Sequence, residues 1–182
     1  LEVKAAIMGC RRAIDASKTD IVLQAQMTVD QNGIMLYGTD IVSAVNIIKD
    51  LGVDVIGINC STGPQEMMAT LGKLASISPV PISVLPNAGM PHNEGGKATY
   101  KLDPETFSKT VARFVNELGV TVIGGCCGTE PAHIEALATL LPTLKAAHRT
   151  LTTLPPFSSP IATLPIKTLP YLIGERLNAQ GS

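Results

Sequence analysis

The stretch LGVDVIGINC, residues 51–60, returns as LGVTVIGGCC at residues 118–127, and this repeat decides the fold. In both copies Leu-Gly-Val is followed in register by Val-Ile-Gly and a closing cysteine, so Cys60 and Cys127 hold equivalent positions. Each copy has the pattern of a helix end, a glycine stop, a short apolar strand and a thiol where the strand ends. The distance between the copies accommodates two strand-helix units, which predicts alternate strands of a parallel α/β array.

Strand and helix signals alternate on both sides of the repeat. The expected strands are residues 21–29, 53–59, 81–89 and 120–125, all short and apolar, as is typical of strands buried on both faces. The expected helices are a tail over 1–15, one capped by Thr39, one opening near Pro64, one from Asp103-Pro104 to Gly119, and one capped by Thr129 and running to about His148. We expect a long polar loop between the third strand and the fourth helix.

A helix followed by four strand-helix units is half of an eight-unit barrel. We therefore interpret residues 1–149 as the C-terminal half of a (β/α)8 TIM-type barrel, an α/β fold. A small, open, doubly wound sheet is the alternative. Residues 150–170 are rich in proline, serine and threonine, which favours an extended linker leading away from the barrel. Residues 171–182 resemble the first strand of another domain, and the missing initiator methionine favours a piece of a longer polypeptide.

Composition narrows the possible partners and compartment. The chain has 182 residues, of which 45% are hydrophobic and 16% charged, which suits one domain with a sizeable core. A formal net charge of −1 and an aromatic content of 3% argue against nucleic acid or an anionic membrane as a partner. No apolar run approaches the ~18 residues of a membrane span. Four cysteines in a chain of this length are not a disulfide scaffold, so we expect a reducing cytoplasm and thiols that bind metal or act in catalysis.

Three thiols gather at the expected strand ends: Cys60, Cys126 and Cys127. In a parallel barrel the active site is built at the carboxyl ends of the strands. Zinc prefers a tetrahedral set of ligands, and three thiolates leave the fourth position open for a substrate. Neighbouring side chains of a regular strand point to opposite faces, so Cys126 and Cys127 must lie where the strand breaks, which Gly125 and Gly128 permit. The alternatives are buried apolar cysteines and a redox pair formed by Cys126 and Cys127.

Several other polar residues are weaker candidates. Asn87, in the motif PNAGMP, follows the strand between the two cysteine-bearing strands. Its amide is placed to contact a substrate or take the vacant metal position, while the same sequence also suits a simple turn. His92 is a candidate for substrate contact. We expect His133 and His148 at the surface and Cys10 in helix packing.

The motifs GINCSTGP, PNAGMP and VIGGCCGT together resemble the homocysteine S-methyltransferase family over about residues 1–149. The resemblance implies that Cys60, Cys126 and Cys127 bind a catalytic zinc ion. It also implies methyl transfer to the thiolate of homocysteine, giving methionine. Zinc coordination deprotonates a thiol, and the thiolate is the nucleophilic form. Three thiolate ligands leave the site net negative, which keeps the bound sulfur electron-rich.

The tail IGERLNAQGS, residues 173–182, resembles the start of the pterin-binding, methyltetrahydrofolate domain in cobalamin-dependent methionine synthases. This implies that Glu175 and Asn178 contact the pterin and that methylcobalamin, recharged from methyltetrahydrofolate, is the methyl donor. The expected partners are homocysteine and the missing N-terminal half barrel, folate and cobalamin domains of the same polypeptide, without which we expect the fragment to be inactive. The alternatives are a cobalamin-independent enzyme using betaine or S-methylmethionine, and a structural zinc or redox dithiol module.

Overall fold

The fold is taken from a computed structural model that describes residues 2–154, 157–159 and 163–164. The helices are α1 (Glu2–Ser17), α2 (Ile41–Ile48), α3 (Pro64–Ile77), α4 (Pro104–Leu118) and α5 (Pro131–Leu140), with a 3-10 turn η1 at Leu141–Thr143. The strands of the central sheet are β1 (Gln24–Met27), β2 (Val55–Asn59), β3 (Ile82–Leu85) and β6 (Val122–Ile123). Within the described residues, no helix is long and apolar enough to span a membrane.

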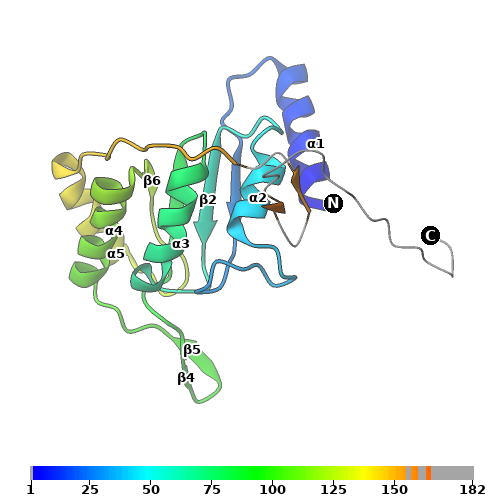
Figure 1. Cartoon of the computed structure of the whole chain (residues 1–182). Coiled ribbons are helices and arrows are strands. Elements are labelled where there is room, and N and C mark those ends of the chain that lie inside the picture. Colours follow the sequence, from blue (N-terminus) through cyan, green and yellow to red (C-terminus); the bar gives the residue numbers. More distant parts are fainter. Residues whose placement is uncertain (1, 155–156, 160–162, 165–182) are drawn as a thin grey trace, which may run out of the picture.

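The central sheet is parallel throughout, and its strands lie side by side in the order β1-β2-β3-β6 (Figure 1). Because the order follows the sequence without reversal, crossovers of one hand place their helices on one face of the sheet. Figure 1 shows α2 and α3 together in front of the strands. A doubly wound sheet instead reverses its strand order and carries helices on both faces. The α/β class is thus confirmed, and the sheet is consistent with part of a TIM-type barrel.

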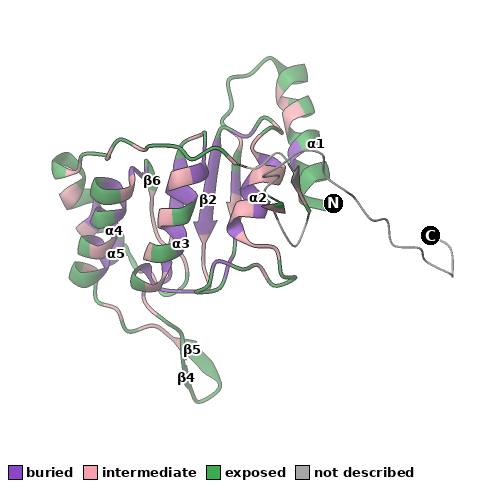
Figure 2. Cartoon of the chain, in the orientation of Figure 1, coloured by how far each residue is buried: buried purple, intermediate pink, exposed green. Residues whose placement is uncertain are grey.

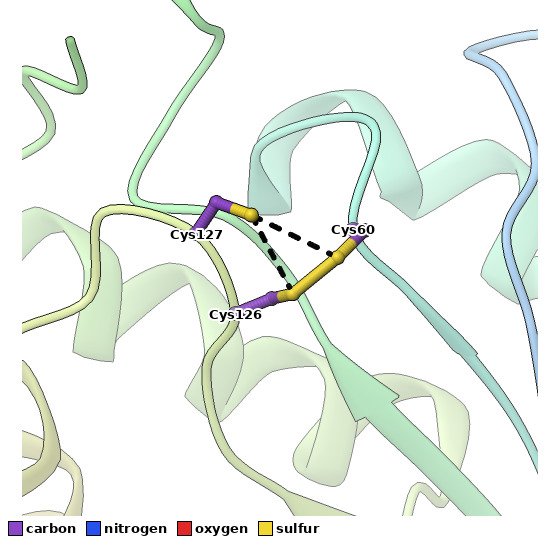
Figure 3. Close-up of side chains that lie close together, drawn as sticks. All are labelled: Cys60, Cys126 and Cys127. Atoms are coloured by element: carbon purple, nitrogen blue, oxygen red, sulfur yellow. Dashed lines mark hydrogen bonds between the residues drawn. A yellow bond between two sulfur atoms is a disulfide. The ribbon is translucent and has the colours of Figure 1, made fainter. Parts of the chain in front are cut away.

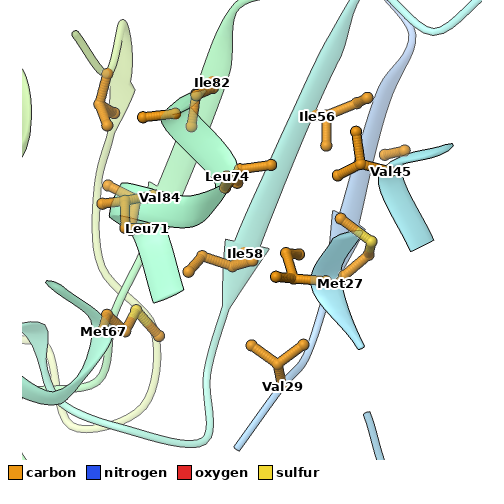
Figure 4. Close-up of a cluster of buried hydrophobic side chains, with 14 of the residues drawn as sticks. Met27, Val29, Val45, Ile56, Ile58, Met67, Leu71, Leu74, Ile82 and Val84 are labelled. Atoms are coloured by element: carbon orange, nitrogen blue, oxygen red, sulfur yellow. The ribbon is translucent and has the colours of Figure 1, made fainter. Parts of the chain in front are cut away.

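The core lies between the sheet and the helices. Alternate residues of β2 and β3 point toward α2 and α3 and are fully buried: Ile56, Ile58, Ile82 and Val84. Figure 4 shows them with the buried Val45 of α2 and Leu71 and Leu74 of α3. Burying one such side chain contributes roughly 1.5–3 kcal/mol. This packing fixes the register of the strands and brings their carboxyl ends to one level. Figure 2 shows the buried strands and the exposed outer faces of the helices.

The face of the sheet turned away from the helices carries a cluster of polar side chains, which differs from the expectation of strands apolar on both faces. Gln24 and Gln26 of β1 both donate to Ser83 Oγ on β3, at 3.3 and 2.7 Å. They reach across β2 because Gly57 leaves room: a Cβ there would lie 2.6 Å from Gln26 Oε1. This face therefore combines an amide–hydroxyl cluster with apolar residues such as Val55 and Val122, which pair in register with Gln24 and Ser83.

Helix starts fall close to their expected positions. Asp103 caps α4 by accepting from the Thr106 N–H at 2.9 Å, and Gly119 ends that helix in the left-handed conformation with φ 67°. Asp40 caps α2 in place of Thr39, because its carboxylate accepts from the Ser43 N–H at 2.8 Å.

The last helix is shorter than expected. Glu130 rather than Thr129 is its N-cap, and α5 ends at Leu140 instead of continuing to His148. Pro142 explains the early end, since it has no N–H to continue the helical hydrogen-bond pattern, and Leu141–Thr143 form a 3-10 turn instead. The Thr129 hydroxyl donates to Cys126 O at 2.6 Å instead of capping the helix.

A hairpin replaces the polar loop expected after β3. Strands β4 (His92–Glu94) and β5 (Lys97–Thr99) pair antiparallel around Gly95 and Gly96, which have φ values of 60° and 83°. Two residues with positive φ form the turn that best matches strand twist, and glycine adopts it without strain. The hairpin projects from the carboxyl end of the sheet (Figure 1).

The described part of the expected linker is extended, but it does not lead away from the sheet as expected. Strands β7 (Phe157–Ser158) and β8 (Thr163–Leu164) pair antiparallel and lie against α2. Asn46 donates to Ser158 Oγ at 2.6 Å, and the hydroxyls of Ser43 and Thr163 are 2.9 Å apart. These polar contacts hold the segment on the helix. The domain start expected at 171–182, with Glu175 and Asn178, lies outside the described residues.

Candidate metal centre

The three cysteines of the repeat converge at the carboxyl end of the sheet (Figure 3). Cys127 Sγ lies 3.9 Å from Cys60 Sγ and 3.9 Å from Cys126 Sγ, and all three sulfurs lie within 4.8 Å of one another. Tetrahedral zinc with Zn–S bonds of ~2.3 Å places its sulfur ligands about 3.8 Å apart. The expected convergence is therefore observed, and the two separations from Cys127 match the spacing of zinc ligands, while Cys60 and Cys126 are closer together. In the part of the chain that the structure describes, this is the only such group of potential ligands.

The structure joins Cys60 and Cys126 in a disulfide and leaves Cys127 as a free, exposed thiol (Figure 3). This pairing differs from the Cys126–Cys127 pair considered from sequence. The Cα atoms of Cys60 and Cys126 are 5.6 Å apart, a separation that disulfides commonly span. A disulfide offers no thiolate, so coordination of one ion by all three cysteines requires a reduced Cys60–Cys126 pair.

A sharp turn directs Cys60 toward the other thiols. Cys60 and Ser61 have φ values of 58° and 66°, in the left-handed region that costs a residue other than glycine roughly 1–3 kcal/mol. The turn is held by two backbone bonds: the Cys60 N–H donates to Leu85 O at 3.1 Å, and the Thr62 N–H donates to Cys60 O at 2.7 Å. Strain of this kind is typical of functional sites, where the surrounding structure enforces it.

Cys126 and Cys127 lie in a turn beyond β6, as their adjacency predicts. The Cys126 N–H donates to Pro86 O at 2.8 Å, and the Thr129 hydroxyl donates to Cys126 O at 2.6 Å. Gly128 has a φ of 76°, a conformation that favours glycine. The break in the strand lets both neighbouring thiols face Cys60.

Asn87 lies beneath the cluster and is 3% exposed. Its side-chain Oδ1 accepts a hydrogen bond from the Cys127 N–H at 3.1 Å, and its backbone N–H donates to Thr62 O at 3.0 Å. Asn87 thus connects the turn after β2 to the turn after β6. A contact of its amide with a substrate or metal stays a prediction, and in this structure the amide oxygen is engaged by the backbone of Cys127.

Tyr100 is a site residue that the sequence did not reveal. Its ring lies against Gly128, where an added Cβ would come within 2.3 Å of Tyr100 Cγ. Burial raises the pKa of its phenol, and the neighbouring Cys127 side chain adds to this effect. The available signal was position: Tyr100 is a rare aromatic residue just before the Asp103 cap, at the level of the strand ends.

The histidines and Cys10 have other roles. His133 was expected at the surface but is 5% exposed: its Nδ1 accepts from the Glu130 N–H at 3.1 Å, and its Nε2 lies 2.9 Å from Leu102 O. A histidine in a first helical turn can close a capping box, and here it also packs edge-on against Phe107. His92 and His148 are exposed. Cys10 is exposed on α1 instead of packed, which corrects the expectation for it.

A parallel α/β sheet that gathers three thiols at its carboxyl end has the organisation of a metal-dependent catalytic domain. The family model for homocysteine S-methyltransferase matches residues 1–141, and the chain belongs to this family. The methionine synthase of Mycobacterium tuberculosis (strain ATCC 25618 / H37Rv) is 40% identical over 184 residues, which covers 100% of this chain and 15% of the relative. The methionine synthase of Mycobacterium leprae (strain TN) is 39% identical over 189 residues, covering 100% and 16%. The chain therefore spans less than a fifth of these curated relatives.

Proposed function

We propose that this chain is the zinc-binding part of an enzyme that methylates the sulfur of homocysteine to give methionine. The observation that carries the proposal is the convergence of the Cys60, Cys126 and Cys127 sulfurs within 4.8 Å of one another, in a chain of the homocysteine S-methyltransferase family. The sheet would form the C-terminal half of a (β/α)8 barrel, completed by an N-terminal half. The helix-free face, which carries the cluster of Gln24, Gln26 and Ser83, is the side on which that half would close the barrel.

Cys60, Cys126 and Cys127 would hold the ion as thiolates. When bound, zinc supplies a Lewis acid that keeps the homocysteine sulfur deprotonated, and so nucleophilic, at neutral pH. The three thiolates leave the centre net negative, which keeps the substrate sulfur electron-rich. That sulfur forms a bond to the methyl carbon as the bond between this carbon and its donor breaks.

The chain's own residues fix the geometry of the ligands. The strained turn at Cys60 and the backbone bond from Cys127 to Asn87 hold two ligands in place before a substrate arrives. Cys127 is exposed while Cys60 and Cys126 are half-buried, so the cluster is open on the Cys127 side. A substrate thiol would enter from this side.

Methylcobalamin, recharged from methyltetrahydrofolate, is the methyl donor in this proposal. Two observations support it: the relatives named methionine synthase extend far beyond this chain, and the tail at 173–182 resembles a pterin-binding domain. Glu175 and Asn178 are the proposed pterin contacts. A donor such as betaine or S-methylmethionine would leave that tail without a role. A reducing cytoplasm suits the site, because the Cys60–Cys126 disulfide would block the three-thiolate centre.

A redox dithiol is the second candidate, and the Cys60–Cys126 disulfide favours it. It gives no role to Cys127, whose sulfur lies 3.9 Å from both partners. A structural zinc site is usually closed by a fourth protein ligand. Among the described cysteine, histidine and acidic side chains, none joins the three thiols.

Metal analysis and X-ray absorption at the zinc edge test the proposal in the full-length, reduced protein. We expect one zinc per chain, and on addition of homocysteine a further sulfur should replace a lighter ligand. An unchanged spectrum at saturating homocysteine would rule out direct thiolate coordination. A protein that holds no zinc but cycles between a Cys60–Cys126 disulfide and dithiol would favour the second candidate.

A matched pair of variants links the metal to activity. Cys127→Ala should abolish homocysteine methylation and zinc retention while sparing methyl transfer between folate and cobalamin, which belongs to the domains beyond the linker. Cys10→Ala, at the exposed thiol on α1, should change neither activity. Loss of both activities in Cys127→Ala, together with unfolding, would instead indicate a structural zinc.

A further inference from the structure

We propose that His133 is a positioning residue of the thiol cluster: its imidazole holds the backbone of Cys127 in place through residues 87–102, and thereby raises the affinity of the cluster for zinc. The inference rests on the proposed function and deepens it, because it extends control of the metal centre to a side chain outside the three ligands. His133 lies in the first turn of α5, shortly after Cys127 along the chain.

The ring of His133 is buried, and both of its nitrogens have a backbone partner. Nδ1 accepts from the Glu130 N–H at 3.1 Å, and Nε2 lies 2.9 Å from Leu102 O. Because a carbonyl oxygen can only accept, Nε2 carries the proton, which leaves Nδ1 free to accept. One neutral tautomer therefore satisfies both partners, and edge-on packing against Phe107 holds the ring in this orientation.

Backbone hydrogen bonds continue from Leu102 to Cys127. The Leu102 N–H donates to Ala88 O at 3.1 Å, and the Ala88 N–H donates to Cys127 O at 2.9 Å. The Cys127 N–H in turn donates to Asn87 Oδ1 at 3.1 Å, so Asn87 and Ala88 hold the backbone of this ligand at both of its polar groups. A shift of Leu102 would therefore move the turn that carries the Cys127 thiol.

The backbone around Gly89 is closely packed between two elements. Gly89 has a φ of 91°, and a Cβ added there would lie 3.1 Å from Leu102 Cβ. On the other side, a Cβ added at Gly63, the N-cap of α3, would lie 2.7 Å from Gly89 Cα. Close-packed groups transmit a displacement rather than absorb it, so the position of Leu102 is felt at Ala88.

The path through His133 closes on itself. Cys127 is followed by the N-cap Glu130 and the first turn of α5, which carries the imidazole. The imidazole returns to Leu102 and, through Ala88, to Cys127 O. A ligand that is fixed before the ion arrives has less freedom to lose on binding. Groups that orient metal ligands from outside commonly change metal affinity by roughly 10–100-fold.

Two substitutions of equal size separate this role from capping of α5. At the third helical position, the side chains of both Glu and Gln can accept from the N–H of the N-cap. Only Gln also offers an N–H to Leu102 O, because a carboxylate has no donor. Capping alone predicts that His133→Glu is at least as good as His133→Gln, since an acidic group is favoured at a helix N-terminus. The positioning role predicts the opposite order.

Zinc affinity is measured in the reduced, full-length protein by competition with a chelator. We expect His133→Gln to stay close to wild type and His133→Glu to bind zinc about tenfold more weakly, at the lower end of the effect of outer partners of metal ligands. Hydrogen exchange in the metal-free, reduced protein gives a readout that does not depend on the ion. The amides of Ala88 and Leu102 should exchange faster in His133→Glu and not in His133→Gln.

The matched control is His148→Glu, which places the same charge at an exposed histidine and should change neither measurement. If His133→Glu does not fold, His133→Leu, with an apolar side chain beside Phe107, replaces it in the comparison with His133→Gln. Equal zinc affinity and equal exchange in the two His133 variants would overturn this inference and leave the proposed function standing. A wild-type protein that holds no zinc when reduced would overturn the proposed function and this inference together.

Discussion

At the scale of single residues, Asn87 is the buried contact that joins two thiol-bearing turns. Asn87→Ala would leave the Cys127 N–H without its acceptor, at a cost of about 1–3 kcal/mol. We expect urea denaturation to show a loss of that size, together with weaker zinc retention. Asn87→Asp keeps an acceptor oxygen and should lose less. Asn93→Ala, in the exposed hairpin, is the control, and an equal loss in both alanine variants would show that Asn87 has no special role.

The cysteines give a second prediction at this scale. When the reduced protein is stripped of metal and oxidised, non-reducing peptide mapping should find Cys60 joined to Cys126, because their Cα atoms are 5.6 Å apart. Zinc binding should be lost with this bond and return on reduction. A dominant Cys126–Cys127 product would contradict the arrangement in Figure 3.

The sequence predicted where these thiols lie, but not which other residues lie against them. The repeat identified Cys60 and Cys127 because strand ends in a parallel sheet recur with the period of the fold. Tyr100 could not be found in this way, since its contact with Gly128 depends on a hairpin whose fold the polar composition hid. Asn87 was located correctly, but its acceptor role depends on the turn geometry at Cys127.

At the scale of elements, the start of α4 predicts a defined response to pH. The Thr106 N–H, followed by other local bonds, lowers the pKa of Asp103 below its ordinary value of 3.8. A lowered pKa in the folded state means that the carboxylate stabilises the protein above that ordinary value and that the contribution disappears as the pH falls through the folded pKa. Thermal unfolding should show Asp103→Ala destabilised at pH 7, and the difference from wild type should shrink below pH 4. Asp103→Asn, which still caps the helix, should be less destabilised at pH 7.

The C-terminal segment after η1 gives another prediction for an element. The Arg149 guanidinium donates to Ser78 O at 2.9 Å and to Val80 O at 3.0 Å, which fastens the segment to the turn between α3 and β3. Arg149→Met should speed hydrogen exchange at residues 144–154 while leaving α4 unchanged. Lys145→Met, a matched change at an exposed cation, should have no such effect. Equal exchange in both variants would show that Arg149 is not the anchor.

Helix α4 lay where the sequence placed it, because one buried apolar face and its two end signals define its type and its extent. The start of α3 near Pro64 was predicted as well. The end of α5 and the hairpin β4–β5 were missed. In both places a short local signal, Pro142 or the Gly95-Gly96 turn, outweighed the composition of the surrounding residues.

At the scale of the whole molecule, the helix-free face of the sheet predicts closure by another half. Gln26 Oε1 is buried and has no hydrogen-bond partner among the described residues. In the four-stranded sheet, β1 and β6 are edge strands with unpaired backbone groups on one side. In a closed barrel both edges would pair with strands of the N-terminal half, and the helix-free face would turn inward. An open sheet would leave both edges exposed to water.

Hydrogen exchange on this chain alone and within the full-length protein distinguishes these two architectures. Closure should slow exchange at the edge amides of β1 and β6, because each gains a neighbouring strand. The inner strands β2 and β3 already have neighbours on both sides, so they serve as the internal control and should change less. Equal protection of the edges in both forms would contradict the half barrel, even though the thiol cluster and the family assignment would stand.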